Sequence, residues 1–89
     1  MSQNRHPKLK KLFFNIRAIR EFRNYSQEYL AAKMGISQNA YSKIELGYTN
    51  IAIMRVLDIA DILDVNISDL LDMDLNKLQK LVPQKFVYN

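Results

Sequence analysis

Four polar residues, Gln38, Asn39, Ser42 and Lys43, are of types that can read the edges of DNA base pairs. Gln and Asn can each form two hydrogen bonds with adenine in the major groove, Lys can donate to the guanine acceptors, and Ser can bond to several edges. At helical spacing these side chains share one side of a helix. The sequence therefore predicts a base-reading surface on the outside of a helix.

The helix that carries these residues has recognisable ends. Ser37 is an N-cap candidate, because its hydroxyl can accept from the backbone N–H groups of the first turn, and Gly47 ends the helix. The side opposite the polar residues is expected to face the core and consists of Ala40, Tyr41 and Ile44.

A similar helix precedes it. Ser26 is its N-cap candidate, the helix is expected over residues 27–34, and Gly35 ends it in the left-handed conformation. Its expected buried positions are Leu30, Ala31 and Met34. Two short helices about a tight turn are a helix-turn-helix, in which the second helix enters a DNA groove.

Three more helices are expected around this pair. The first starts near Pro7, which suits a first helical turn, and its apolar positions are Leu9, Leu12, Phe13 and Ile16. The fourth is expected over residues 51–63, with the core positions Ile53, Val56, Leu57, Ala60 and Leu63. Ser68 is expected to cap a short fifth helix, and the core is closed by Leu70 and Leu71.

The composition is that of one small helical domain. The 89 residues are 48% apolar and include only two glycines and two prolines. The absence of cysteine excludes disulfides and Cys-ligated zinc, and the single His6 is no metal site. Without a glycine-rich phosphate loop or a nucleophile beside carboxylates, we expect no catalytic residues, metal or cofactor. No apolar run approaches about 18 residues and the polar start is no signal peptide, so we expect a cytoplasmic protein without membrane contact.

Charge is unevenly distributed along the chain. Residues 1–50 hold nine Lys and Arg against three Asp and Glu, whereas residues 51–89 hold four against six. The basic half contains the predicted helix-turn-helix. This asymmetry is expected if one end of the molecule meets DNA phosphates, although a solvated basic helix beside an acidic one would also produce it.

The register of these signals resembles the XRE-type, phage-repressor-like helix-turn-helix family over about residues 12–72. The matching positions are 16–20, 25–31, 35–37, 44–47, 63–65 and 70–71. The resemblance implies an all-α, compact five-helix domain that reads double-stranded DNA with its second and third helices. We divide the chain into a basic segment at 1–11, a DNA-binding domain at 12–72 and a C-terminal helical extension at 73–89.

Individual roles follow from the resemblance. It implies that Gln27 binds a DNA phosphate through its amide and the helix N-terminus, in agreement with the helix dipole. It implies a structural salt bridge between Arg20 and Glu45, and base-edge or phosphate contacts by the four polar residues of the third helix. The other expected phosphate contacts are Ser37, Tyr48, Thr49, Asn50 and Arg5.

The chain departs from the family pattern at three positions. Asn24 and Asp64 stand where glycine is common, and Ile51 stands where proline is common. Asn and Asp tolerate the left-handed conformation better than other residues with a Cβ, so the fold prediction is unchanged. Replacing proline by Ile51 leaves the backbone before the fourth helix less constrained.

Both ends of the chain allow two interpretations. The N-terminal lysines can be the polar side of a long first helix, or residues 1–6 can form an arm whose Arg5 reaches DNA. At the other end, an apolar stripe can fold back on its own domain or form a homodimer seam, and its members are Leu71, Leu75, Leu78, Val82 and Phe86.

A sequence-specific DNA-binding transcriptional regulator, and a repressor by family type, is the favoured function. One alternative is an antitoxin-like regulator that binds DNA and also holds a partner protein through its C-terminal segment. The other is a protein-interaction module with a helix-turn-helix shape.

Overall fold

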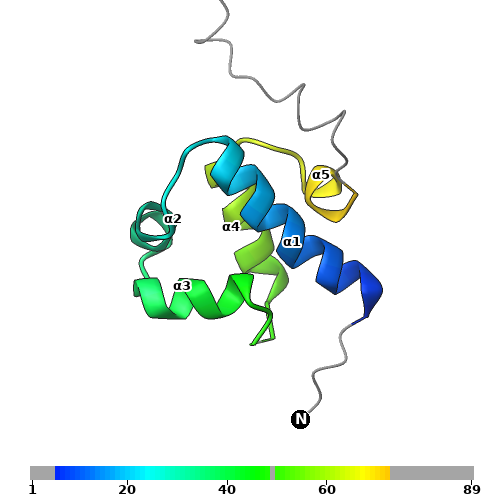
Figure 1. The fold of residues 1–89 in the computed structure, drawn as a ribbon, viewed down its shortest axis with the longest axis horizontal. Coiled ribbons are helices and arrows are strands. Elements are labelled where there is room, and N and C mark those ends of the chain that lie inside the picture. Colours follow the sequence, from blue (N-terminus) through cyan, green and yellow to red (C-terminus); the bar gives the residue numbers. More distant parts are fainter. Residues whose placement is uncertain (1–5, 49, 73–89) are drawn as a thin grey trace, which may run out of the picture.

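The structure is a computed structural model and describes residues 6–48 and 50–72. These residues form five α-helices and no strand, which confirms the predicted all-α fold (Figure 1). The helices are α1 (Pro7–Phe22), α2 (Gln27–Met34), α3 (Gln38–Glu45), α4 (Ile53–Leu63) and α5 (Ile67–Leu71). None of them combines the length and apolar character needed to span a membrane.

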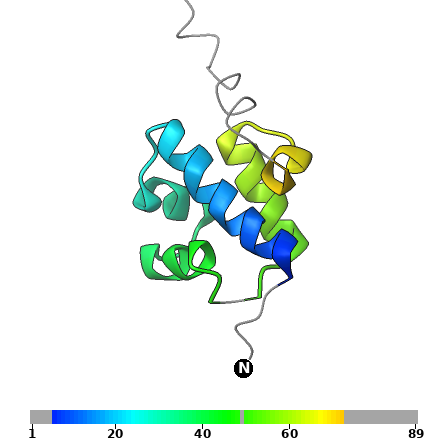
Figure 2. The same cartoon turned by 45° about the vertical axis from the view of Figure 1, so that its right-hand side comes forward.

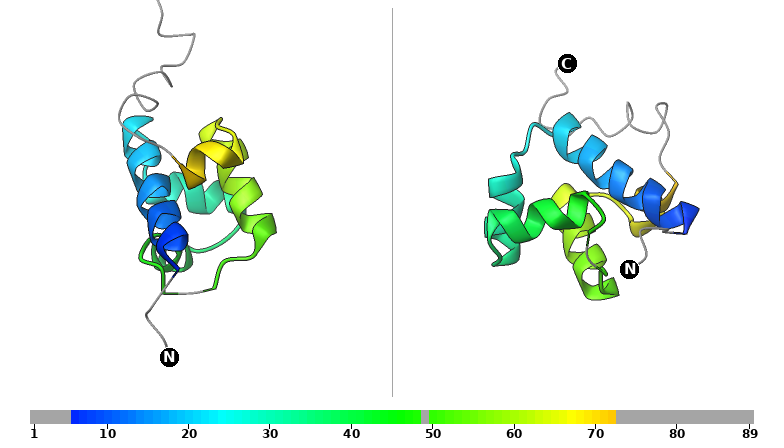
Figure 3. Two further views of the ribbon diagram at one scale, coloured as in Figure 1. Left: turned by 90° about the vertical axis from the view of Figure 1, so that its right-hand side faces the viewer. Right: turned by 60° about the horizontal axis from the view of Figure 1, so that its bottom comes forward.

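The longest helix, α1, runs through the middle of the arrangement. Figure 2 shows α2 and α3 on one side of α1 and α4 and α5 on the other. Figure 3 shows α5 at the end of α4 that is farther from the loop after α3. All five helices contribute to one core, whose fully buried side chains include Ile16, Ile19, Leu30, Tyr41, Ile59, Leu63 and Leu70.

Serine caps and left-handed residues set the ends of the short helices. Ser26 Oγ accepts from the backbone N–H of Tyr29 at 2.9 Å, and Ser37 Oγ accepts from that of Ala40 at 3.0 Å. Gly35 ends α2 with φ at 70°. The predicted left-handed conformation is also found at Asn24 and Asp64, the two positions where glycine is common in similar sequences. Their φ angles are 63° and 59°.

The predicted core face of α4 is partly wrong. Val56, Ala60 and Leu63 are buried, but Ile53 is 61% and Leu57 42% exposed, and Ile59 takes a fully buried position instead. The face that packs inward follows the spacing i, i+3, i+4 and i+7 from Val56, so Ile53 and Leu57 lie beside that face. The helix also begins at Ile53 rather than residue 51.

Three smaller predictions are corrected. Ala40 is exposed, because it lies at the rim of a surface hollow between α3 and α4 instead of beneath α3. The fifth helix is capped by Asn66 and not Ser68, and the Asn66 N–H donates to Asp69 Oδ2 at 3.3 Å. Only Leu70 of its two leucines is buried; Leu71 is 41% exposed, because adjacent helical residues point in different directions.

The N-terminal lysines lie on α1. Pro7 occupies the first helical turn, and His6 Nδ1 accepts from the Lys8 N–H at 3.1 Å and so caps the helix. The structure therefore supports the helix interpretation for residues 7–11. The arm interpretation rests on Arg5, which lies outside the described residues, as do Thr49, Leu75, Leu78, Val82 and Phe86.

The fifth helix is tied to α1 by a contact that the sequence did not predict. The buried Asn15 donates from Nδ2 to the Leu70 carbonyl at 2.8 Å. Lys11 and Asp72 add an exposed ion pair at 3.1 Å. Asn15 lies inside a run of apolar residues on α1. A polar side chain in such a run is buried and needs a hydrogen-bond partner, and this is the sequence feature from which the contact could have been predicted.

Candidate nucleic-acid interface

The third helix presents most of the predicted base readers to solvent. Gln38, Asn39 and Lys43 are exposed and Ser42 is half-buried. On the opposite side Tyr41 is fully buried and Ile44 is 7% exposed. The helix therefore has a solvent side of hydrogen-bonding groups and a side fixed in the core.

The last residue of α3, Glu45, is the centre of a buried polar cluster. Its carboxylate accepts from Arg20 Nε at 2.6 Å and from Arg20 Nη2 at 3.1 Å. Tyr41 Oη donates to the same carboxylate at 2.6 Å, and Gln27 Nε2 donates at 3.1 Å. The side chains of Arg20 and Glu45 are only 10% and 3% exposed. The structure thus brings together the residues of the expected salt bridge.

This cluster connects three helices. Arg20 lies on α1, Gln27 opens α2, and both bind the carboxylate that ends α3. Arg20 Nη1 also donates to the Tyr25 carbonyl, at 2.9 Å, in the connection between α1 and α2. Because charge-assisted bidentate pairs are strong and directional, the cluster fixes the angle of α3 against its neighbours.

These contacts determine which side chains of the cluster are charged. Burial alone would raise the pKa of Glu45, but hydrogen bonds from Arg20, Tyr41 and Gln27 outweigh it and hold the pKa below its ordinary value. The pKa of Tyr41 is raised by burial and by its bond to Glu45. The hydrogen bonds to Glu45 raise the pKa of Arg20. The cluster is therefore an ion pair with a neutral phenol at neutral pH.

A helix packed on its neighbours along one side and polar on the other has the geometry of a recognition helix. The family model described as helix-turn-helix matches residues 16–70, which include the whole of α2, α3 and α4. This chain belongs to the XRE-type helix-turn-helix family. The family consists of DNA-binding regulators and is not typically enzymatic. No curated protein and no solved structure matches the chain.

Within the helix-turn-helix, the side-chain amide of Gln27 has one partner in the structure and a different expected partner on DNA. Its amide donates to Glu45 in the free protein, whereas the resemblance implies a contact with DNA phosphate. A Gln amide has two N–H donors, so one bond to Glu45 leaves a second donor. The bond to Glu45 holds the side chain at the start of α2, where the backbone N–H groups favour an anion.

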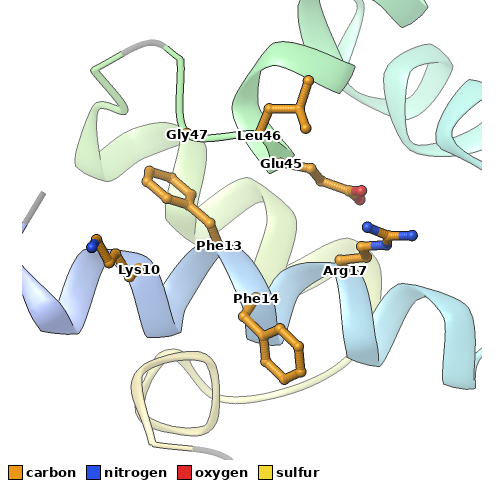
Figure 4. A pocket seen from close by; sticks show the side chains of 7 residues that line it. All are labelled: Lys10, Phe13, Phe14, Arg17, Glu45, Leu46 and Gly47. Atoms are coloured by element: carbon orange, nitrogen blue, oxygen red, sulfur yellow. The ribbon is translucent and has the colours of Figure 1, made fainter. Parts of the chain in front are cut away.

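The loop after the recognition helix is described in part. Tyr48 is 64% exposed and Asn50 is also exposed. Gly47 begins this loop with φ at 74° and packs closely on Phe13 of α1 (Figure 4). The exposed Tyr48 is therefore accessible for the phosphate contact expected from the family.

One basic residue beside the recognition helix was not predicted as part of the site. Arg55 of α4 lines a surface hollow of about 310 Å³ together with Ser37, Asn39 and Lys43. Its Nη1 lies 3.5 Å from the Met34 carbonyl at the end of α2. Arg55 is half-buried and lines this hollow beside α3. The sequence signal for this position was a basic residue in the first turn of α4, directly after the loop that follows α3.

Proposed function

We propose that this helix-turn-helix protein is a sequence-specific transcriptional regulator that reads the major groove with α3. The observation that carries the proposal is the arrangement of that helix: its last residue, Glu45, is held by three side chains, while Gln38, Asn39 and Lys43 are exposed. A helix that is held rigidly loses little conformational freedom when it binds DNA. The hydrogen bonds from its exposed side chains can then contribute to discrimination between bases.

Phosphate contacts would orient this helix in the groove. We assign them to Gln27 and Ser37 at two helix N-termini, and to the loop residues Tyr48, Thr49 and Asn50. Support comes from the Ser37 cap, whose hydroxyl accepts from the Ala40 N–H at the start of α3, and from the excess of basic residues in residues 1–50. Arg55 joins this group because it borders the same hollow as Asn39 and Lys43.

We infer repression as the regulatory outcome. A compact domain lying in the groove excludes other proteins from the same base pairs, and two copies on adjacent half-sites exclude them from a longer stretch. A homodimer with the C-terminal stripe at its seam stays part of this proposal. Of that stripe the structure describes only Leu71, which is exposed.

Selection of bound duplexes from a random pool tests this function. The protein is expected to enrich one motif, and a palindrome in that motif would report the dimer as well. A reporter gene that carries the motif in its promoter should then lose expression when the protein is present. Retention of the pool without enrichment of any sequence would overturn the proposal of sequence-specific reading.

An antitoxin-like regulator with a partner protein is the second candidate, and one observation favours it. Phe14 is 70% and Leu46 57% exposed, and both line a hollow of about 330 Å³ with Lys10 and Arg17 (Figure 4). Glu45 also lines this hollow, but its side chain is only 3% exposed, so the accessible charges are those of Lys10 and Arg17. An apolar hollow with accessible basic side chains fits an acidic, apolar protein segment. Stoichiometric co-purification of a second protein, lost on Phe14→Asp, would favour this candidate, whereas a homogeneous preparation that binds DNA favours the first.

A further inference from the structure

Ala40 is an exposed apolar residue on α3, the helix that carries the proposed base readers. It lines the hollow between α3 and α4, to which Ile36 and Ile44 also contribute apolar side chains. Ile36 is half-buried and Ile44 is 7% exposed, so Ala40 is the most exposed of the three. The hollow therefore has an apolar wall whose accessible edge is the methyl group of Ala40.

The rest of this hollow is polar and is supplied by both helices. Asn39 and Lys43 of α3 are proposed base readers, and Arg55 of α4 is a proposed phosphate contact. At about 100° per residue, Ala40 lies on the circumference of α3 between Lys43 on the solvent side and Ile44 on the buried side. It thus borders the side of α3 that shares the hollow with Arg55.

The methyl group of Ala40 has a fixed position. The backbone N–H of Ala40 donates to Ser37 Oγ at 3.0 Å, and the next residue, Tyr41, is fully buried in the core. An alanine side chain loses no rotamer freedom when it is covered. A contact with this methyl group therefore costs little ordering entropy on binding.

We propose that Ala40 recognises the 5-methyl group of a pyrimidine, and so selects thymine at one position of the DNA motif. Base pairs present hydrogen-bonding groups and the thymine methyl group in the major groove, and alanine is a residue type that contacts this methyl group. Ala40 itself can offer no side-chain hydrogen bond. The proposal rests on the proposed function, for which it names a further specificity-determining residue and the group that it selects.

The order of groups across the hollow matches the order across the groove. The 5-methyl group of thymine lies at the edge of the base pair nearest the backbone of its own strand, and the hydrogen-bonding groups of the pair lie farther across. Ala40 likewise lies between the base reader Lys43 and the phosphate contact Arg55. Cytosine presents only a C–H at this edge, so it leaves the apolar wall without a methyl group to cover it.

Replacement of thymine by deoxyuridine tests the contact, because it removes the methyl group and keeps every hydrogen-bonding group of the base pair. Each thymine of the duplex enriched from the random pool is replaced in turn, and the affinity is measured at one salt concentration. We expect replacement at the recognised position to weaken binding about fourfold, as removal of one methyl group from an apolar contact does.

An Ala40→Gly protein assigns the effect to this residue. It should bind the thymine and deoxyuridine duplexes equally well. The ratio of the two affinities is the informative quantity, because any loss of folded protein weakens both alike. Ala32→Gly is the matched control, since Ala32 is exposed on α2 and glycine has a similar cost in either helix. This control should keep the roughly fourfold preference for thymine.

A second pair of duplexes distinguishes the methyl group from the rest of thymine. The recognised base pair is replaced by a G·C pair that carries either cytosine or 5-methylcytosine. The wild-type protein should favour the methylated duplex about fourfold, and Ala40→Gly should not distinguish the two. Equal binding of both duplexes by the wild-type protein would contradict recognition of the methyl group.

Two further results would overturn the proposal. One is an enriched motif in which no thymine is sensitive to deoxyuridine, and the other is a sensitivity that persists unchanged in Ala40→Gly. In both cases the enriched motif still supports sequence-specific reading. If the wild-type protein enriches no duplex, the proposed function itself fails, and the role of Ala40 fails with it.

Discussion

Arg20 and Glu45, which lie 25 positions apart, form a bidentate ion pair in which Nε and Nη2 of the arginine bind different oxygens of the carboxylate, at 2.6 and 3.1 Å. Neither residue faces the solvent side of α3, so the pair acts on DNA only through the position of that helix. Changes to the pair should therefore affect all DNA sequences alike.

Glu45→Ala should lower the melting temperature and weaken binding to every duplex by a similar factor. Removal of one member of a buried pair costs about 3–5 kcal/mol, because the other charge is left unmatched. Glu45→Gln is the control, since it keeps the shape and part of the hydrogen bonding. Thermal denaturation and binding to a panel of duplexes would measure both effects. A stable Glu45→Ala protein with altered base preference would assign Glu45 to the reading surface instead.

Stability should fall in acid through Glu45. In the folded chain Glu45 binds its proton less tightly than in the unfolded chain, so its contribution is present above the ordinary pKa of 4.5 and is lost as the pH falls below that value. Tyr41 should lower stability at the alkaline end. Its pKa is raised on folding, so above the ordinary pKa of 10.0 the unfolded chain loses the phenol proton more readily and the free energy of unfolding falls. Urea denaturation across pH tests both, and in Glu45→Gln the acid limb should flatten.

Two glycines with similar backbone angles should respond differently to alanine. Gly35 and Gly47 have φ of 70° and 74°, so each substitution incurs roughly 1–2 kcal/mol of left-handed strain. A Cβ on Gly35 meets nothing within 4 Å, whereas a Cβ on Gly47 would lie 3.0 Å from Cδ2 of the buried Phe13. We expect Gly47→Ala to melt at a lower temperature than Gly35→Ala. Equal melting temperatures would mean that Phe13 moves aside freely.

Binding should weaken steeply with salt, and Arg55 should account for part of the slope. Each neutralised phosphate contributes about −0.9 to the slope of log K against log salt, so Arg55→Gln should make the slope shallower by roughly that amount. Arg17→Gln is the control, because Arg17 is exposed on α1 and pairs with Glu21 at 3.1 Å. Loss of stability in Arg55→Gln with an unchanged slope would instead assign Arg55 to the packing of α4 on α2.

The features that the sequence predicted well depend on local chemistry. Ser26 and Ser37 cap their helices and Gly35 ends α2 because each needs only its own neighbours. The predictions for Ile53 and Leu57 failed because α4 is apolar on most of its surface, and periodicity alone does not select the face that meets α1 and α2. The position of Arg55 beside Asn39 likewise depends on how α4 packs, so a tertiary contact decides it.

The most direct test of the account is the base preference of an Asn39→Ala protein. Asn39 is exposed on α3, and a bidentate contact to a base contributes about 1–3 kcal/mol of discrimination. Selection from a random duplex pool, performed in parallel for Asn39→Ala, Glu45→Gln and the wild-type protein, would compare their motifs. We predict that Asn39→Ala loses preference at one or two base pairs at an unchanged melting temperature, whereas Glu45→Gln keeps the wild-type motif with lower affinity. An Asn39→Ala motif identical to the wild type at every position, together with unchanged motifs for Gln38→Ala and Lys43→Ala, would contradict the assignment of α3 as the reading helix.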